Sequence, residues 1–198
     1  MVLIGLNGKK GSGKDTAGEY LCAHYDFECL SFAEPLKVSA AAALGFDPPA
    51  WDTFEEWKNN PDARIVVVID GIEEKSITVR EFLQFYGTEA HRNVFGADFW
   101  TKQLLDRLDP HGRYVITDAR FVNECSAIKD AGGTIILIER PGTDAEDAHA
   151  SEAPLPDELI DTTINNNGTV ADFHRTLDAY MAIITVTMTG TVETLAAR

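Results

Sequence analysis

The 198-residue sequence has few cysteines, a deficit of basic residues and no long apolar run. Its three cysteines show no metal-ligand or redox spacing, which predicts reduced thiols, no disulfide and a cytoplasmic location. No apolar run approaches the roughly 18 residues needed to span a bilayer, so we expect no membrane partner. The 17 Lys and Arg residues are outnumbered by 32 Asp and Glu residues, which gives a formal charge of −15. A nucleic-acid polymer is excluded as a partner on this ground, because binding its backbone requires a basic face.

The elements predicted from hydrophobic periodicity alternate between strands and helices. Strands are predicted at 2–7, 29–32, 113–117, 134–139 and 161–165, and helices at 14–25, 35–44, 79–86, 98–108, 122–131 and 170–187. This order predicts an α/β fold of three layers, in which a mainly parallel sheet is flanked by helices and binds ligands at the carboxyl ends of its strands. We expect a single domain over residues 1–198. An irregular insertion is predicted from 45 to 62, followed by a hairpin that pairs 65–69 with 75–78.

Residues 8–14, Gly-Lys-Lys-Gly-Ser-Gly-Lys, match the G-x-x-x-x-G-K phosphate-binding motif. The motif follows an apolar strand and opens a helix, which is the context that it requires. Its glycines allow successive backbone N–H groups to converge on phosphate oxygens, and Lys14 is predicted to hold the β- and γ-phosphates of ATP. The residues predicted to contact ATP here are Gly11, Ser12, Gly13, Lys14, Asp15 and Thr16.

The residue after the loop lysine is Asp15, where a Ser or Thr that binds Mg²⁺ is usual. Mg²⁺ is still expected, since transfer between polyanions requires charge neutralisation. Either Asp15 contacts the metal or its waters, or it caps the helix or orients the acceptor while Thr16 contacts the α-phosphate. Asp15 and Thr16 are therefore the candidate metal ligands.

A second polar cluster, Thr117-Asp118-Ala119-Arg120, follows the apolar strand that ends the segment 113–117. This is the end of a parallel strand, where ligands bind in open α/β sheets. Asp118 is predicted to orient the acceptor or to hold Mg²⁺ through water, and Arg120 to bind a phosphate with two hydrogen bonds. The alternative is a helix-capping Asp and a surface Arg.

With these motifs the chain resembles the deoxynucleoside monophosphate kinases of tailed bacteriophages, over nearly its whole length. The segments that carry the resemblance, in order, are Gly-Lys-Lys-Gly-Ser-Gly-Lys-Asp-Thr at 8–16, Ala-Glu-Pro-Leu-Lys at 33–37, Val-Arg-Glu-Phe-Leu-Gln-Phe-Tyr-Gly-Thr-Glu at 79–89, Phe-Trp-Thr-Lys at 99–102, Thr-Asp-Ala-Arg-Phe-Val-Asn-Glu at 117–124, Glu-Arg-Pro-Gly at 139–142, Asp-Ala-His-Ala-Ser-Glu at 147–152 and Ile-Asn-Asn-Asn-Gly-Thr at 164–169. Each is weak alone, whereas their order is specific. Asp after the loop lysine is similar to the form found in the family.

The resemblance implies a P-loop kinase that transfers the γ-phosphoryl group of ATP to a deoxynucleoside 5′-monophosphate. It implies a lid at about 140–157 in which Arg140 contacts ATP, and a homodimer is a further expectation. The residues implied to bind the acceptor are Lys10, Lys37, Arg80, Gln84, Gly87, Thr88, Trp100, Arg120 and Glu124.

Several of these residues have a plainer interpretation. Trp100 lies at core spacing, Gln84 can cap a turn, and Lys37 can be a surface side chain. Glu124 can anchor Arg120 or be solvated. Two rival functions also remain: a P-loop kinase of another phosphorylated metabolite, similar to phosphomevalonate kinases, and a non-catalytic ATP-binding regulatory protein.

Overall fold

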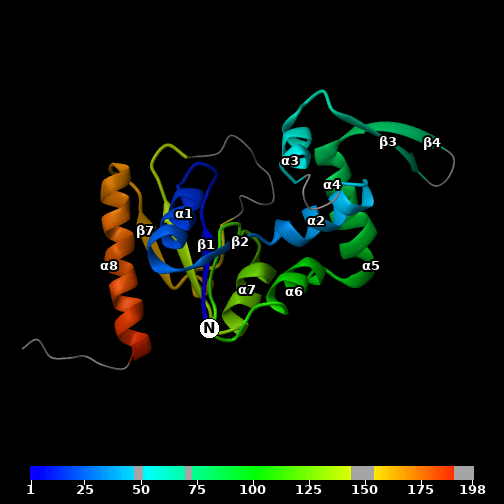
Figure 1. The fold of residues 1–198 in the computed structure, drawn as a ribbon. Helices are drawn as coiled ribbons and strands as arrows, with labels where there is room; N and C mark the ends of the chain where they lie inside the picture. The colour runs from blue at the N-terminus through cyan, green and yellow to red at the C-terminus, as the bar shows by residue number, and fades with distance from the viewer. Residues whose placement is uncertain (47–50, 70–72, 144–153, 190–198) are drawn as a thin grey trace, which may run out of the picture. The chain divides into compact units, whose positions relative to one another are not determined.

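Five strands form a fully parallel sheet in the order β2-β5-β1-β6-β7 (Figure 1). The structure is a computed structural model that describes residues 1–46, 51–69, 73–143 and 154–189. The strands are β1 Val2–Asn7, β2 Glu28–Leu30, β5 Arg113–Ile116, β6 Thr134–Glu139 and β7 Thr162–Asn165. The α/β class and the parallel sheet predicted from the sequence are confirmed. Each strand of the sheet lies within two residues of its predicted bounds.

Helices cover both faces of this sheet (Figure 1). Helices α1, Lys14–Tyr25, and α8, Val170–Thr189, pack on one face, and α7, Val122–Asp130, packs on the other. Alternate residues of β1 point to opposite faces, as the period of a strand requires. Ile4 and Leu6 belong to the core shared with α1 and α8, whereas Gly5 lies against Ile128 of α7. The three-layer arrangement is therefore confirmed.

The chain divides into two compact units. Unit 1, residues 1–30 and 111–198, contains the parallel sheet, and unit 2 is the segment 31–110. Unit 2 contains α2 Ala33–Ala43, α3 Trp51–Asn59, β3 Arg64–Ile69, β4 Glu73–Thr78, α4 Val79–Gly87, the π-helix η2 Thr88–Arg92, α5 Asn93–Phe95 and α6 Phe99–Leu105. Unit 1 also has a short 3-10 helix, η4, at Asp157–Leu159. No helix in the described ranges is both long enough and apolar enough to cross a membrane.

The predicted hairpin is confirmed, since β3 pairs with β4 in antiparallel register. The predicted irregular segment is partly wrong, because α3 forms within it. Phe54 and Trp57 of α3 are spaced to share one helical face, and both rings pack against Phe46. Phe54 is fully buried. Tertiary burial of this face therefore outweighs the acidic residues and flanking prolines that favoured a loop.

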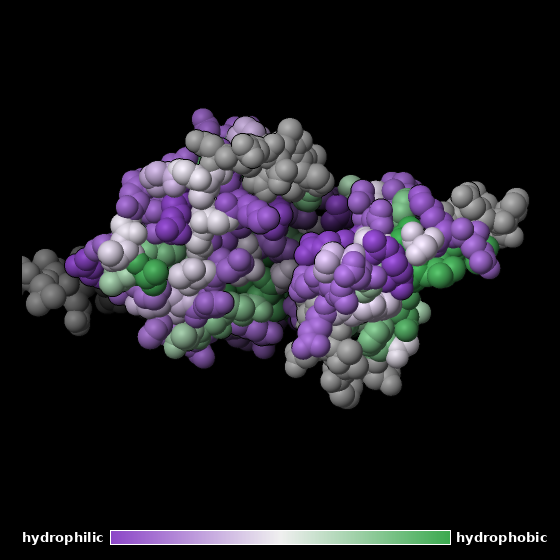
Figure 2. Space-filling model, turned by 90° about the horizontal axis from the view of Figure 1, so that it is seen from above, coloured by the Kyte–Doolittle hydropathy of each residue, from purple (hydrophilic) through white to green (hydrophobic). Residues whose placement is uncertain are grey.

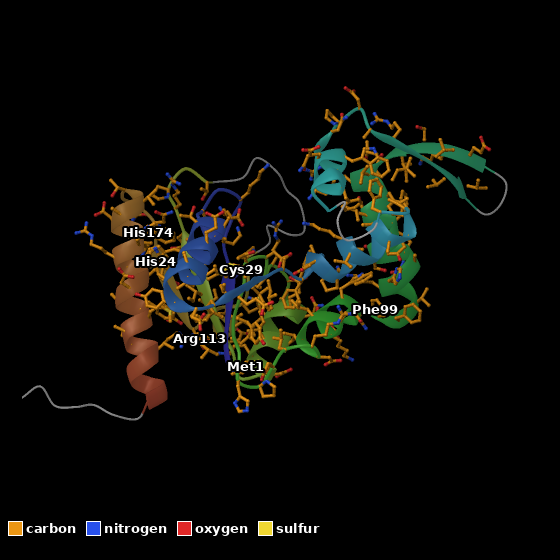
Figure 3. All side chains as sticks on the ribbon, in the orientation of Figure 1. Met1, His24, Cys29, Phe99, Arg113 and His174 are labelled. Carbon is orange, nitrogen blue, oxygen red and sulfur yellow. A yellow bond between two sulfur atoms is a disulfide. The ribbon has the colours of Figure 1, made fainter. Side chains whose placement is uncertain are left out.

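Helix α8 is fixed to α1 through polar and aromatic contacts (Figure 3). The ring of Tyr20 stacks on His174 with centroids 3.9 Å apart and contacts His24 at 4.5 Å. The hydroxyls of Tyr20 and Tyr25 both donate to Asp178 Oδ1, at 2.8 and 2.6 Å. The hydrogen bond to Asp178, with a smaller contribution from burial, raises the pKa of Tyr25 to about 12. These contacts with α8 thus hold α1, the helix that follows the glycine loop, in place.

The expectation of no disulfide is wrong, because Cys22 of α1 and Cys29 of β2 form one. Their Cα atoms are 6.1 Å apart, within the usual range for a disulfide. The chain reverses at Asp26, whose φ of 56° is left-handed, and this brings β2 beside α1. Sequence spacing did not reveal the pair, since a disulfide depends on proximity in three dimensions. Cys125 is a buried free thiol, and burial raises its pKa to about 12.

Reduction of this disulfide is expected to lower the free energy of unfolding by about 2.5 kcal/mol, the chain-entropy value for a closed loop of about eight residues. Urea titrations of the oxidised protein with and without dithiothreitol measure the difference. Cys22→Ser is the control, because its stability should not respond to the reductant. Equal stability of the oxidised and reduced wild-type protein would contradict the expectation.

Candidate phosphate-binding site

The glycine loop of residues 8–13 joins β1 to α1 in unit 1. The φ angles of Gly8, Gly11 and Gly13 are 144°, 79° and 109°, a region that side chains with a Cβ rarely adopt. Gly13 is the N-cap residue of α1, and no side chain caps that helix end. The first N–H groups of α1 therefore remain directed toward the loop, where anions are favoured.

Lys14 and Ser12 place two polar groups inside this loop. Lys14 is 7% exposed, and its Nζ donates to the carbonyl oxygens of Gly8 and, at 2.8 Å, of Lys9. Ser12 is 1% exposed, and its Oγ has no hydrogen-bond partner among the described residues. A buried hydroxyl without a partner is costly, and an acceptor such as a phosphate oxygen would satisfy it.

The Thr117–Arg120 segment lies directly beside the loop. Asn7, the last residue of β1, donates from Nδ2 to the carbonyl oxygen of Ala119 at 2.7 Å. Gly18 of α1 faces Thr117 so closely that a Cβ at this glycine would collide with the threonine methyl group. The structure therefore brings the backbone that carries Asp118 against the phosphate loop, as parallel strand ends require. The Asp118 side chain is half-buried and that of Arg120 is exposed.

Glu124 is buried, at 4% exposed, and caps helix α7. Its Oε2 accepts the backbone N–H groups of Arg120, at 2.9 Å, and Phe121, at 3.1 Å. Glu124 is therefore not a solvated residue, and it contacts Arg120 through the Arg120 backbone. A carboxylate at this position also suits the positive end of the helix dipole.

A cavity of about 690 Å³ opens beside the loop in unit 1. Its lining includes Gly8 and Lys9 from the loop, Arg140 at the end of β6, and Asn165 and Asn167 after β7. Arg140 is exposed, and Thr143 donates to its carbonyl oxygen at 2.7 Å. Most of the lid predicted at about 140–157 lies outside the described residues, as does the motif at 147–152.

Lys10 of the loop and the candidate metal ligands Asp15 and Thr16 of α1 are less buried than Lys14. Lys10 is exposed, Asp15 is exposed in the first turn of α1, and Thr16 is half-buried next to it. A carboxylate in the first turn of a helix is itself favourable, so helix stabilisation and metal binding remain compatible roles for Asp15. Within the described ranges no group of three His, Cys, Asp or Glu side chains is placed to hold a metal ion.

The other predicted acceptor residues belong to unit 2. Lys37 is half-buried on α2, and Gln84 is exposed on α4. Arg80 is exposed and donates to Asn59 Oδ1 at 2.9 Å. Thr88 begins the π-helix η2, a helix type found frequently at functional sites. The structure brings the glycine loop and the Asp118 segment together in one unit and places these residues in the other.

Trp100 packs as a core residue within unit 2. It is 3% exposed, contacts the rings of His91 and Phe99, and donates from Nε1 to the carbonyl oxygen of Gly87 at 3.1 Å. Gly87 is buried against Leu36 of α2. Of the two interpretations of Trp100, the burial favours the core residue, which supports the turn at Gly87 and Thr88.

Sequence reasoning missed two asparagines that contact this site. Asn7 joins the loop to the Asp118 segment, and Asn166 donates to the carbonyl oxygen of Ser12. A signal for Asn7 exists, because asparagine is disfavoured in strands yet ends the apolar run of β1. The signal for Asn166 is weaker, since three consecutive asparagines at 165–167 suggest only a loop.

Comparison with known proteins identifies the family of the chain. Residues 51–177 match the family described as deoxynucleotide monophosphate kinase. A protein of Acanthamoeba polyphaga mimivirus assigned as a deoxynucleotide monophosphate kinase is 37% identical over 189 residues, which cover 88% of this chain and 93% of that protein. The deoxynucleotide monophosphate kinase of Enterobacteria phage T4 is 27% identical over 230 residues, which cover 87% of this chain and 95% of the phage protein. Among solved structures, the dephospho-CoA kinase from Campylobacter jejuni is similar, with a TM-score of 0.48, 16% identity and coverage of 93% of this chain and 98% of that chain. The family match spans more than half of the chain and the viral relatives match most of its length, so the chain belongs to the deoxynucleotide monophosphate kinase family.

Proposed function

We propose that this chain transfers the γ-phosphoryl group of ATP to a deoxynucleoside 5′-monophosphate, giving the diphosphate and ADP. The observation that best supports this proposal is that Asn7 holds the Asp118 segment beside the phosphate loop. Its Nδ2 lies 2.7 Å from the Ala119 carbonyl oxygen. Donor phosphates in the loop would thus lie beside a carboxylate suited to orienting an acceptor. In the transfer, the bond from the γ-phosphorus to the β-phosphate oxygen breaks and a bond to an acceptor phosphate oxygen forms. The acceptor phosphate is largely a dianion near pH 7, so no general base is required.

The donor side is supported by the groups inside the loop. The family of nucleotide kinases uses ATP, and the buried Lys14 ammonium carries the charge that its β- and γ-phosphates require. The carbonyl partners of Lys14 are neutral, whereas phosphate oxygens are charged and form stronger hydrogen bonds with an ammonium group. The 690 Å³ cavity beside the loop has room for the nucleoside part, with Arg140 at its edge.

Mg²⁺ is proposed as the metal of the reaction. The donor set fits it, because Asp15 and Thr16 supply hard oxygen ligands at the loop, and Mg²⁺ usually binds through one or two protein groups, waters and substrate phosphates. When bound, the ion would neutralise charge on the phosphates. Asp118, whose two neighbours are held by the contacts of Thr117 and Ala119, would hold the acceptor or bind Mg²⁺ through water.

For the acceptor, we propose that Lys10, Lys37, Arg80 and Arg120 balance the charge of its phosphate. Unit 2 would contribute contacts to base and sugar through Gln84, Gly87 and Thr88, with Trp100 supporting them from the core. The two units would act as one kinase domain. Phosphoryl transfer through a loose transition state depends mainly on positioning and charge neutralisation, which these cations supply.

The product suggests a role in nucleotide supply for viral DNA synthesis in the cytosol of a host. Glutathione keeps thiols reduced in such a compartment, so there the Cys22–Cys29 pair would be a dithiol and would form the bond on oxidation. The same loop and Asp118 segment would suit a kinase of another phosphorylated metabolite. A regulatory ATP-binding protein would not require both Asp118 and Arg120 in the segment beside the loop.

A coupled assay of ADP formation tests the proposal. The acceptor panel contains the deoxynucleoside and ribonucleoside monophosphates, mevalonate phosphate and dephospho-CoA. We expect ADP formation with at least one deoxynucleoside monophosphate. Turnover with only mevalonate phosphate or dephospho-CoA would assign another kinase, and ATP binding without ADP formation for every acceptor would assign a regulatory protein.

We also propose a homodimer through the outer face of the β3–β4 hairpin. Val66 and Val68 are 68% and 60% exposed on this face, and Figure 2 shows hydrophobic surface over the hairpin. Arg64 lies at one end of the same face and Glu74, the partner of Val68, lies at the other. A two-fold axis through the middle of this face would pair Arg64 of each copy with Glu74 of the other, which is the self-complementarity that such dimers require.

The dimer proposal predicts that Val66→Glu combined with Val68→Glu converts the protein to a monomer. Burying these carboxylates against a second copy would be costly, because unpaired charges lose their hydration. Sedimentation equilibrium should give about twice the 21.7 kDa chain mass for the wild type and the single mass for the variant. Val94→Glu is the matched control, since Val94 is 67% exposed outside the hairpin. A wild-type protein that sediments as a monomer at micromolar concentration would refute the dimer.

A further inference from the structure

Asn166 is a buried polar residue that contacts the phosphate loop from outside. It is 7% exposed and directly follows β7. Its side-chain Nδ2 donates to the carbonyl oxygen of Ser12 at 2.9 Å. Its backbone N–H donates to the carbonyl oxygen of Glu139 at 2.7 Å, which extends the pairing of β7 with β6. Asn166 is therefore held by the sheet while its side chain holds the loop.

The peptide bond between Ser12 and Gly13 determines the direction of the Gly13 N–H, because Asn166 binds the carbonyl oxygen of the same peptide. The bond is planar, and the described chain has no cis peptide bond, so the Ser12 C=O and the Gly13 N–H point to opposite sides. The carbonyl faces Asn166. The Gly13 N–H consequently faces away from Asn166.

The approach of Asn166 depends on the absence of a side chain at Gly13. A Cβ at Gly13 would lie 2.6 Å from Asn166 Nδ2 and 3.3 Å from the ring of Phe173. The φ of 109° at Gly13 would itself be strained for other residues. The approach of Asn166 to the loop therefore requires glycine at position 13.

The two residues that flank Asn166 have a different environment. Asn165 and Asn167 are exposed and line the cavity beside the loop, whereas Asn166 between them is buried. The middle asparagine thus acts on the loop that holds phosphates, and the outer two border the space proposed for the nucleoside.

We propose that Asn166 is a positioning residue for the phosphoryl donor, because it fixes the Ser12–Gly13 peptide so that the Gly13 N–H is directed at the donor phosphates. This proposal rests on the proposed function, in which ATP occupies the loop. Without the Asn166 donor, the buried Ser12 carbonyl loses its partner and the peptide can rotate away from the orientation that binds phosphate.

The first test compares Asn166→Ala with the wild type. We expect kcat/KM for ATP to fall about 10- to 100-fold, the range that corresponds to an unsatisfied buried carbonyl, with KM for the acceptor changed less than about 3-fold. Binding of inorganic tripolyphosphate, measured by competition with a fluorescent ADP analogue, should weaken by a similar factor. Asn93→Ala is the matched control, because Asn93 is an exposed asparagine of α5 that no part of the site uses, and its tripolyphosphate affinity should stay near that of the wild type.

The second test uses Asn166→Asp, which preserves the size of the side chain. A carboxylate cannot donate to Ser12, whereas a protonated carboxyl group can. The ratio of variant to wild-type kcat/KM should therefore rise as the pH falls from 8 to 5.5, a response that a purely structural role would not produce. Wild-type tripolyphosphate affinity in Asn166→Ala, or a flat ratio for Asn166→Asp, would overturn the proposal. A wild-type protein that forms no ADP with any monophosphate would instead overturn the proposed function, and the tripolyphosphate measurements would still decide the role of Asn166.

Discussion

Replacement of Lys14 by alanine or methionine is expected to lower kcat by about 10²- to 10³-fold, the loss found when one preorganised charge-stabilising group is removed from an active site. The Lys14 ammonium is buried in the loop, at 7% exposed, and is held there by backbone carbonyls. In a loose transition state negative charge develops on the leaving β-phosphate oxygens, so a fixed cation beside the β- and γ-phosphates stabilises the transition state more than the ground state. Steady-state ADP formation measures kcat for each variant.

Lys14→Met separates charge from packing. It preserves most of the aliphatic chain and removes the ammonium group, so a fall equal to that in Lys14→Ala would assign the effect to charge. Lys75→Ala is the matched control, because Lys75 is an exposed lysine of β4 that no part of the site uses. Wild-type kcat in either Lys14 variant would refute the assignment of the loop.

The sheet and the phosphate loop could be predicted because both depend on local sequence. Alternating apolar strands and helices determine the layers, and the spacing of Gly8, Gly11 and Gly13 before Lys14 specifies a loop conformation. Helix α3 could not be predicted in this way. Its Phe54 and Trp57 become helical through burial against Phe46, a contact that local composition does not reveal.

The other contacts that were not predicted depend on the path of the chain in three dimensions, which residue spacing does not reveal. Cys22 and Cys29 meet because the chain reverses at Asp26, and Asn166 meets Ser12 across 154 positions of sequence. A resemblance to a family can indicate that such a residue matters, since the segment 164–169 was part of it. Only the fold indicates what the residue does, because the direction of the Asn166 side chain follows from the β6–β7 pairing.

The Asp118 segment shows how such contacts determine a functional group. The N–H of Thr117 donates to the Leu30 carbonyl oxygen at 3.0 Å, and the Ala119 carbonyl oxygen accepts from Asn7 at 2.7 Å. A backbone hydrogen bond on one side and a side-chain hydrogen bond to the backbone on the other therefore hold the residues that flank Asp118. A carboxylate held in this way loses little entropy when it orients a substrate, which is the advantage of preorganisation.

Asp118→Asn is accordingly expected to lower kcat by about 10²-fold while ATP affinity changes less than about 3-fold. The amide has the size of the carboxylate but lacks its charge, so it cannot order a metal-bound water or the acceptor as strongly. ATP affinity should persist because the loop and Lys14 are untouched. Steady-state kinetics and equilibrium binding of ATP measure the two quantities separately.

Asp130→Asn is the matched control for the loss of one carboxylate, since Asp130 is exposed at the end of α7 in the same unit. It removes the same charge from the protein as a whole and should leave kcat near that of the wild type. An unchanged kcat in Asp118→Asn would rule out its role in the transfer step. A loss of ATP affinity with kcat unchanged would instead place Asp118 in donor binding, because equal losses in the ground and transition states leave kcat unaltered.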